Sequence, residues 1–325
     1  MLRLTDHWVW DFWSASEGND HHVFFLQASR SLGDPELRHA NATVGHAVST
    51  DLSTWTLLPD ALRPGPAGSW DDLAIWTGSI ICAYGRWHML YTGVSRTENG
   101  LVQRIGLATS TDLATWEKHP ANPLIEADPR WYELLDLNVW HEQAWRDPWL
   151  FADPDGKGYH VLMTARVKDG PTEGRGVIGH AWSQDLVHWQ VRPPITEAGE
   201  FGQLEVPQTV EVEGRPFLLF STAAEHVSRS RLARLDGMPN TGVYTCAGMS
   251  LLGPFDLAAD ATVIADDTLY VGRVVFGEGH QPVLMAFVNK DESGRFVGEL
   301  TDPLPLAVDP GGRLVLASPP TGHSA

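Results

Sequence analysis

Short apolar runs, rich in β-branched and aromatic residues, alternate along the chain with clusters of turn-forming residues. Such runs occupy residues 23–28, 77–83, 87–93, 159–165, 217–221 and 283–288. Their length and composition are typical of β-strands, and the glycine-containing turns at 84–86 and 155–158 are typical of hairpins. No long segment shows the periodicity of an amphipathic helix. The pattern therefore predicts an all-β fold.

One segment of the chain recurs. Its copies begin at Gly45, Gly106 and Gly179, which are 61 and 73 residues apart, and each copy ends in Asp-Leu-x-x-Trp. A weaker fourth copy runs over residues 244–255. Repeats of such a period usually represent one supersecondary unit that is copied around an axis or along a stack.

Each repeat unit accommodates an inner strand, its hairpin partner, the Gly-x-Ala-x-Ser strand and an outer strand after the Asp-Leu-x-x-Trp turn. Four-stranded units around an axis form a β-propeller. We therefore expect a five-bladed β-propeller, with antiparallel blades around a central channel, as one domain spanning residues 1–325. The expected blades begin near Phe24, Ile75, Trp149, Val206 and Thr268, and the fifth ends near Leu300.

The repeated residues themselves are predicted to be structural. The tryptophan that ends each copy is expected to pack between blades rather than to bind a ligand. The aspartate of each copy is expected to cap its own turn by accepting backbone N–H groups.

Composition narrows the possible functions. The 325 residues carry a formal net charge of −18, which excludes binding to nucleic acid or to an anionic membrane as an expected function. No run of about 18 apolar residues predicts a membrane span. Residues 1–8 lack the apolar core of a signal peptide, so a cytoplasmic location is expected. The two cysteines, Cys82 and Cys246, are predicted to be buried free thiols. The histidines show no metal-ligand spacing, so neither a metal nor another cofactor is predicted.

Three acidic residues outside the repeat are candidates for catalysis. Asp11, Asp147 and Glu205 each lie near the predicted start of an inner strand, flanked by aromatic or apolar residues. A charge in such surroundings is unfavourable unless it is paired or functional. Singly, each has a structural alternative: a turn or helix cap, a turn salt bridge, or a strand-end charge. Because inner strands converge on the channel of a propeller, we expect the three carboxylates to meet there.

The chain resembles the five-bladed propeller glycosidases of glycoside hydrolase families 32, 68 and 43. Arg-Asp-Pro at 146–148, Glu-Val-Pro at 205–207 and the segment 45–55 resemble family 32 blocks. Val-Trp-Asp-Phe-Trp at 9–13 resembles instead the Val-Trp-Asp-Ser-Trp block of family 68, the levansucrases, and Trp-Thr-Gly-Ser at 76–79 resembles a block of both families. The resemblance covers roughly residues 5 to 300. About 25 residues follow, so the C-terminal β-sandwich usual in family 32 is not expected.

The resemblance implies a retaining glycosidase that acts on β-fructofuranosyl linkages of sucrose or fructo-oligosaccharides. By this resemblance Asp11 is the nucleophile, Glu205 the acid and base, and Asp147 a stabiliser that binds sugar hydroxyls. Two carboxyl groups support retention when they are about 5–5.5 Å apart. Site residues expected to contact the substrate are Trp10, Trp76, Thr77, Arg146 and Gln203. Trp13 is either a third wall of the pocket or a packing residue.

Two alternatives remain open on the same fold. One is an arabinofuranosidase or xylosidase of the family 43 type, whose inverting chemistry needs the carboxyl groups roughly 6.5–9.5 Å apart. The other is a sugar-binding propeller without catalysis, which the presence of all three acids disfavours. Either way the expected partner is a small sugar or oligosaccharide, and the sequence is silent on oligomeric state.

Overall fold

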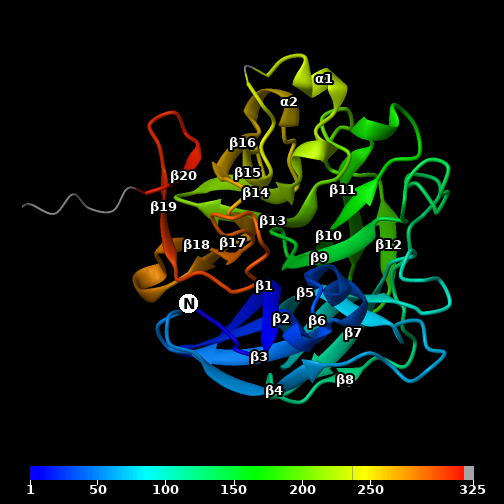
Figure 1. Cartoon of the computed structure of the whole chain (residues 1–325), viewed down its shortest axis with the longest axis vertical. Helices are drawn as coiled ribbons and strands as arrows, with labels where there is room; N and C mark the ends of the chain where they lie inside the picture. Colours follow the sequence, from blue (N-terminus) through cyan, green and yellow to red (C-terminus); the bar gives the residue numbers. More distant parts are fainter. Residues whose placement is uncertain (236, 318–325) are drawn as a thin grey trace, which may run out of the picture.

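The protein is a five-bladed β-propeller. The structure, a computed structural model, describes residues 1–235 and 237–317. Within them, twenty strands form five four-stranded antiparallel sheets around a common axis, so the predicted fold class is confirmed. Figure 1 shows the innermost strand of each sheet near the middle of the view and the outermost strand near the rim.

The strands follow the chain in order from the inside of each blade to its outside. Blade I contains β1 (His7–Glu17), β2 (Asp20–Ser29), β3 (Thr43–Ser49) and β4 (Thr56–Leu62). Blade II contains β5 (Ala74–Ala83), β6 (Arg86–Val94), β7 (Arg104–Ser110) and β8 (Glu117–Lys118). Blade III contains β9 (Trp145–Ala152), β10 (Tyr159–Arg166), β11 (Gly176–Ser183) and β12 (Trp189–Arg192).

Blade IV contains β13 (Glu205–Val212), β14 (Arg215–Thr222), β15 (Gly242–Ala247) and β16 (Thr262–Ala265). Blade V contains β17 (Leu269–Phe276), β18 (Pro282–Val288), β19 (Leu304–Val308) and β20 (Leu314–Leu316). The described helices are short and lie in connections: η1 (Arg30–Leu32), η2 (Pro35–Asn41), η3 (Thr172–Gly174), η4 (Ala224–His226), α1 (Arg229–Leu232), α2 (Leu257–Asp260) and η5 (Glu278–His280).

Two predicted blade boundaries are wrong. Phe24 lies in the second strand of blade I, because the segment around Asp11 already forms the inner strand β1. Blade V extends to Leu316 rather than ending near Leu300. Leu300 instead pairs with Leu2, the two residues exchanging N–H···O bonds of 3.1 and 3.0 Å. This pairing joins the N-terminus to the last blade and closes the ring.

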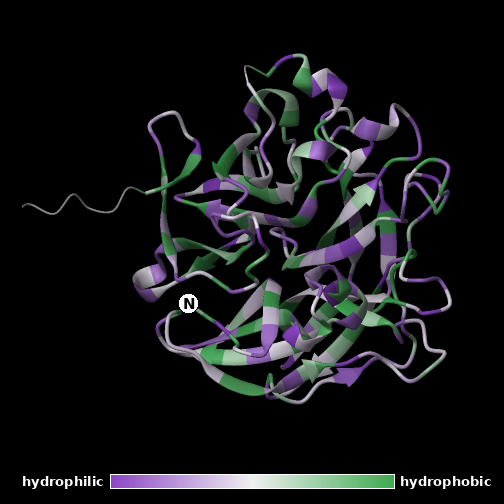
Figure 2. Cartoon of the chain, in the orientation of Figure 1, coloured by the Kyte–Doolittle hydropathy of each residue, from purple (hydrophilic) through white to green (hydrophobic). Residues whose placement is uncertain are grey.

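The hydrophobic core lies between neighbouring blades. Separate clusters of buried apolar residues join blades II and III, III and IV, and IV and V, and the largest cluster joins blade I to both of its neighbours. In Figure 2 the hydrophobic residues follow the strands, and the loops around the rim are mostly hydrophilic. Trp116 packs edge-on against Phe24 across the first blade boundary, with ring centroids 5.7 Å apart. The predicted packing role of the repeated tryptophan is confirmed there.

The repeated aspartates cap their turns, as predicted. Asp51 accepts N–H groups from Ser53 and Thr54 at 2.8 and 2.7 Å, and Asp112 and Asp185 make the same pair of bonds. These backbone bonds hold the pKa of the Asp51 carboxyl below its usual range, because they favour its charged form. Each copy therefore contains a turn that its own side chain stabilises.

One cysteine prediction is wrong. Cys246 is buried, but Cys82 is exposed because it lies at the outer end of β5, next to the hairpin turn. Both are free thiols. Among the helices of the described residues, each is too short or too polar to cross a membrane.

Paired histidines occupy equivalent places in two blades. His46 Nε2 lies 2.9 Å from His22 Nδ1 in blade I, and His180 Nε2 lies 2.9 Å from His160 Nδ1 in blade III. Blade II has Leu107 at the position of His46 and His180. Burial and the neighbouring imidazole lower the pKa of His46 to about 4. A hydrogen bond between two imidazoles needs one ring nitrogen without a proton to accept it. Protonation of both rings at low pH therefore breaks each pair.

We predict that His46→Leu reduces the acid sensitivity of the fold. Below pH 6.5 the unfolded chain takes up a proton that the folded His46 refuses until about pH 4. Stability therefore falls as the pH drops through this window. Blade II has leucine, Leu107, at the equivalent position. Relative to wild type, the variant should gain about 1–3 kcal/mol between pH 7 and pH 4.5.

Urea unfolding at several pH values measures this effect. The control is His188→Gln, which changes an exposed histidine outside both pairs. An equal pH dependence for wild type and His46→Leu would show that the pair does not govern acid stability.

Candidate active site

All five inner strands carry a β-bulge at the same level of the propeller. The strand pairing shifts at residues 10–12 of β1, 76–78 of β5, 146–149 of β9, 205–208 of β13 and 270–273 of β17. A bulge adds a residue to one strand and redirects the side chains beside it. Five such bulges around one axis therefore point extra side chains toward the end of the channel.

The residues at these bulges form a cavity of about 580 Å³. The residues just before the bulges are Trp10, Trp76, Arg146, Glu205 and Tyr270, and those that follow them are Asp11, Thr77, Asp147, Val206 and Val271. All ten line the cavity. Asp147, Val206 and Val271 have positive φ angles of 59°, 49° and 52°. This backbone region is unfavourable for side chains, most of all β-branched ones, so the surrounding structure must hold it in place.

Hydroxyl groups of one blade support the bulge of the next. Three backbone N–H groups donate to them: Asp147 to Thr92 Oγ1 at 3.0 Å, Val206 to Thr164 Oγ1 at 3.2 Å, and Val271 to Ser221 Oγ at 2.9 Å. The Thr164 hydroxyl also donates to the Asp147 carboxylate at 2.7 Å. Thr164 thus connects the bulges of blades III and IV.

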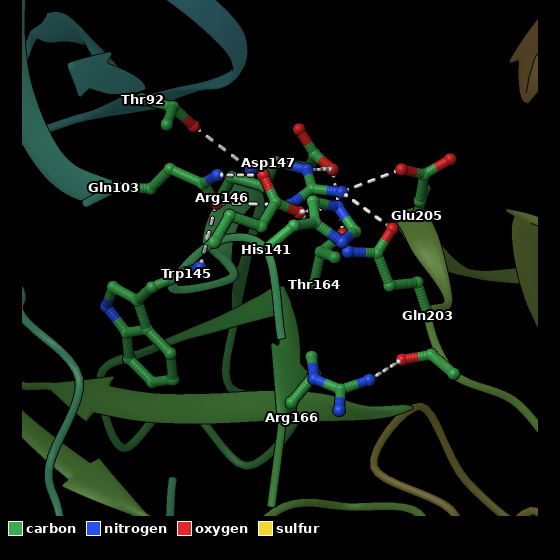
Figure 3. Close-up of polar contacts among 12 residues, drawn as sticks. Thr92, Gln103, His141, Trp145, Arg146, Asp147, Thr164, Arg166, Gln203 and Glu205 are labelled. Atoms are coloured by element: carbon green, nitrogen blue, oxygen red, sulfur yellow. Dashed lines mark hydrogen bonds and ion pairs between the residues drawn. The ribbon is translucent and has the colours of Figure 1, made fainter. Parts of the chain in front are cut away.

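The structure brings the three predicted carboxylates together. Asp11, Asp147 and Glu205 come from blades I, III and IV and line the same cavity. Arg146 lies between two of them, as Figure 3 shows: Nη2 donates to Glu205 Oε1 at 2.7 Å, and Nε lies 3.4 Å from Asp147 Oδ2. One guanidinium therefore balances part of the negative charge in the cavity.

Arg146 is itself held by a polar network. Glu142 Oε1 accepts from Arg146 at 2.7 Å and from Gln203 Nε2 at 2.6 Å. Gln203 Oε1 and Gln103 Oε1 accept from Arg146 at 3.2 and 3.1 Å. These bonds fix the plane of the guanidinium, and with it the direction in which Glu205 points.

Burial and like charges act on the aspartates. The pKa of Asp11 is raised to about 7 by burial and by the charge of Asp147, although Thr77 donates a hydrogen bond of 2.5 Å to Asp11 Oδ2. Burial also raises the pKa of Asp147, against the opposing effect of Arg146. Two nearby buried carboxyls do not ionise independently, so the pair gives up its protons in coupled steps.

Glu205 lies in a different environment. The Tyr270 hydroxyl donates to Glu205 Oε2 at 2.5 Å, while Arg146 contacts the other oxygen. Burial and the adjacent Glu205 charge raise the pKa of Tyr270 well above its usual value, so its hydroxyl remains a donor. The Glu205 side chain is 21% exposed, whereas those of Asp147 and Arg146 are almost fully buried. Glu205 is therefore accessible to an incoming water or sugar, as an acid and base needs to be.

The other predicted contact residues line the cavity, with one exception. Trp10, Trp76, Thr77, Arg146 and Gln203 all do so. Trp13 does not: it is 1% exposed and stacks on Phe24. The alternative of a third pocket wall is therefore wrong, because residue 13 lies beyond the bulge, where the alternation of β1 turns its ring into the core.

Sequence reasoning missed several cavity residues. Tyr270 lies in blade V, which carries no recognisable copy of the repeat, and Glu142 precedes its strand in a long loop. Arg38 and His39 line the cavity from η2. The four-residue spacing of Glu142 and Arg146 was the one local signal that these two side chains could pair.

The geometry agrees with the result of comparing the chain with known proteins. The model of the glycosyl hydrolases family 32 N-terminal domain matches residues 15–259. The chain belongs to this family. An insoluble β-fructofuranosidase isoenzyme of Arabidopsis thaliana is 34% identical over 176 residues, which cover 51% of this chain and 28% of that protein. A fructan 6-exohydrolase of Beta vulgaris is 32% identical over 158 residues, covering 46% and 23%. The chain thus matches about a quarter of the length of these relatives.

Solved structures of other proteins share the fold. The inulosucrase of Halalkalicoccus jeotgali bound to kestose superposes with a TM-score of 0.77 at 21% identity, covering 96% of this chain and 87% of that one. Fructan 1-exohydrolase IIa of Cichorium intybus gives a TM-score of 0.70 at 20% identity, covering 97% and 59%.

We predict that Asp11→Asn stabilises the protein at neutral pH. Folded Asp11 keeps its proton until about pH 7, whereas an unfolded aspartate loses it near pH 3.8, so the wild-type fold loses stability as the pH rises through this window. The neutral amide avoids this loss. In urea unfolding, the variant should match wild type near pH 4 and exceed it by about 2–4 kcal/mol at pH 7.

Asp51→Asn is the matched control, because the pKa of Asp51 is shifted in the opposite direction. That variant should be less stable than wild type at neutral pH. If Asp11→Asn were also less stable than wild type at pH 7, the proposed destabilisation by ionised Asp11 would be refuted.

Proposed function

We propose that this chain is a glycoside hydrolase that cleaves β-fructofuranosyl linkages of sucrose or fructo-oligosaccharides with retention, with transfer to sugars as a side activity. The main support for this proposal is that Asp11, Asp147 and Glu205, from three blades, line one cavity in a chain of family 32. Its relatives include a β-fructofuranosidase and a fructan exohydrolase, which supports the substrate class.

The proposed roles are those that the resemblance to families 32 and 68 implies for these acids. Asp11 attacks the anomeric carbon after losing its proton, and the Thr77 hydrogen bond holds the attacking carboxylate in place. Glu205 protonates the departing oxygen and later deprotonates the incoming water. Asp147, beside Arg146, hydrogen-bonds sugar hydroxyls as positive charge develops at the anomeric carbon.

The cavity walls suit a neutral furanosyl ring. Trp10 and Trp76 line the cavity, and the Trp76 ring is fixed by a 2.8 Å bond from Nε1 to the His39 carbonyl. His141, Glu225 and His226 add polar side chains to the lining. In the proposed reaction, the departing sugar lies beside Glu205.

Incubation with sucrose, 1-kestose and nitrophenyl pentofuranosides tests the proposal. We expect fructose release from the two fructosides, with β-fructofuranose as the first anomer seen by rapid NMR. Release of the α-anomer would indicate inversion, and hydrolysis of arabinofuranosides or xylosides alone would favour the family 43 type of activity. A chain that binds fructosides without turnover would be a sugar-binding propeller.

Two variants separate the proposed roles. Asp11→Asn should lose about 1,000-fold or more in kcat on every fructoside, because no nucleophile remains. Glu205→Gln should lose about 100- to 10,000-fold on sucrose. Its loss on a nitrophenyl β-fructofuranoside should be much smaller, since that leaving group departs without a proton. Equal losses of Glu205→Gln on both substrates would contradict the acid role, provided that circular dichroism shows a native fold.

A further inference from the structure

A second arginine, Arg273, is buried outside the cavity lining and takes no part in the network around Arg146. Arg273 follows the bulge of β17 and is 2% exposed. Its guanidinium is positioned by the bulges of two other blades. Nη1 donates to the carbonyl of Pro207 in blade IV at 2.6 Å, and the guanidinium carbon lies 5.1 Å from the ring centroid of Trp149 in blade III.

Most of this guanidinium has no partner. Within residues 1–235 and 237–317, neither Nε nor Nη2 of Arg273 has a hydrogen-bond acceptor, and no carboxylate forms a salt bridge with it. Arg273 is also absent from the residues that line the cavity. A buried cation with one hydrogen bond is unfavourable unless nearby negative charge compensates.

The compensating charges belong to the cavity. Burial lowers the pKa of Arg273 to about 10, and the negative charges of Asp147 and Asp11 oppose a larger shift. Arg273 therefore stays protonated at neutral pH. In a buried, weakly screened environment its field reaches both carboxylates without direct contact.

We propose that Arg273 is a positioning residue that acts through Asp11 and Asp147, favouring the ionised form of both carboxylates from a buried place outside the cavity lining. It thereby lowers the pH above which the nucleophile is available. The catalytic part of this inference rests on the proposed function; the charge coupling itself does not.

Other groups also act on Asp11. Asp147 and Glu205 raise the pKa of Asp11, and Tyr270 is neutral. Thr77 and Arg38 lower it, Arg38 from the cavity lining, where its guanidinium also contacts the exposed Glu36 at 3.0 Å. Arg146 is shared among Glu142, Asp147 and Glu205. Arg273 is the buried cation without an ion-pair partner in this part of the described chain.

The pH dependence of kcat/KM on sucrose tests the proposal, because its acid limb reports ionisations of the free enzyme. Arg273→Met should move that limb to higher pH by about one unit, which is about a tenfold loss at a pH below the limb. Arg273→Lys keeps the charge and should restore most of the shift. Arg231→Met, which removes a buried arginine paired with Glu200 away from the cavity, should leave the limb in place.

A double-mutant cycle in urea unfolding tests the coupling without any activity. At about pH 9, where Asp11 is largely ionised and Arg273 is still protonated, Arg273→Met should lower the urea midpoint, and it should do so much less in the Asp11→Asn background, because the amide has no charge to compensate. If Arg273→Met alone fails to fold, the double variant Arg273→Met/Asp11→Asn should fold.

Two results would overturn the inference: an unmoved acid limb in Arg273→Met, or an additive cycle. If no fructoside is hydrolysed while the cycle is non-additive, the proposed function fails and the charge coupling stands. If sucrose is hydrolysed and the cycle is additive, the proposed function stands and the charge coupling fails.

Discussion

The cavity depends on one backbone feature, the ring of β-bulges at the ends of the five inner strands. A regular strand presents alternate side chains to one face, so it offers one residue to the channel where a bulge offers two neighbours. This is how Arg146 and Asp147, adjacent in sequence, both line the cavity. Without the bulges, one member of each pair would turn into the interface between blades.

The ring of bulges is held by contacts between blades. Each of Thr92, Thr164 and Ser221 lies on the second strand of its blade and binds a bulge N–H of the next blade. The positive φ angles of Val206 and Val271 persist because these hydroxyls and the packed blades leave no alternative. Any change that loosens one blade therefore disturbs the cavity side chains of its neighbour.

The repeat made the architecture predictable. The capping aspartates and inter-blade tryptophans recur at regular intervals, so five blades and their strand order followed from the sequence. The three acids were also found, because acidic residues flanked by aromatic or apolar residues are conspicuous. Boundaries failed where the pattern is broken: β1 carries Asp11 amid its apolar residues, and the bulge moves Trp13 from the cavity side to the core.

The cavity residues that sequence reasoning missed depend on tertiary structure alone. Nothing local distinguishes Tyr270 or Arg273 from other residues of a β-rich segment, because their partners lie more than 60 residues away. Arg38 and His39 lie in a connection, where no periodicity places a side chain. A bulge cannot be located from a strand pattern either, since one inserted residue only shifts the alternation. The positions of these residues follow once the blades are closed into a ring.

The electrostatics of the cavity follow from this geometry. Carboxylates from three blades converge because the bulges of those blades meet, and each one buried raises the free energy of ionising the next. Arg146 in the cavity lining and Arg273 outside it both come from bulged strands. The same backbone feature therefore supplies the crowded negative charge that the proposed chemistry needs and the cations that keep it compatible with a stable fold. A substitution at one of the ten bulge residues that line the cavity therefore changes both the proposed catalysis and the stability of the fold. A substitution in the repeated turns at the rim affects stability alone.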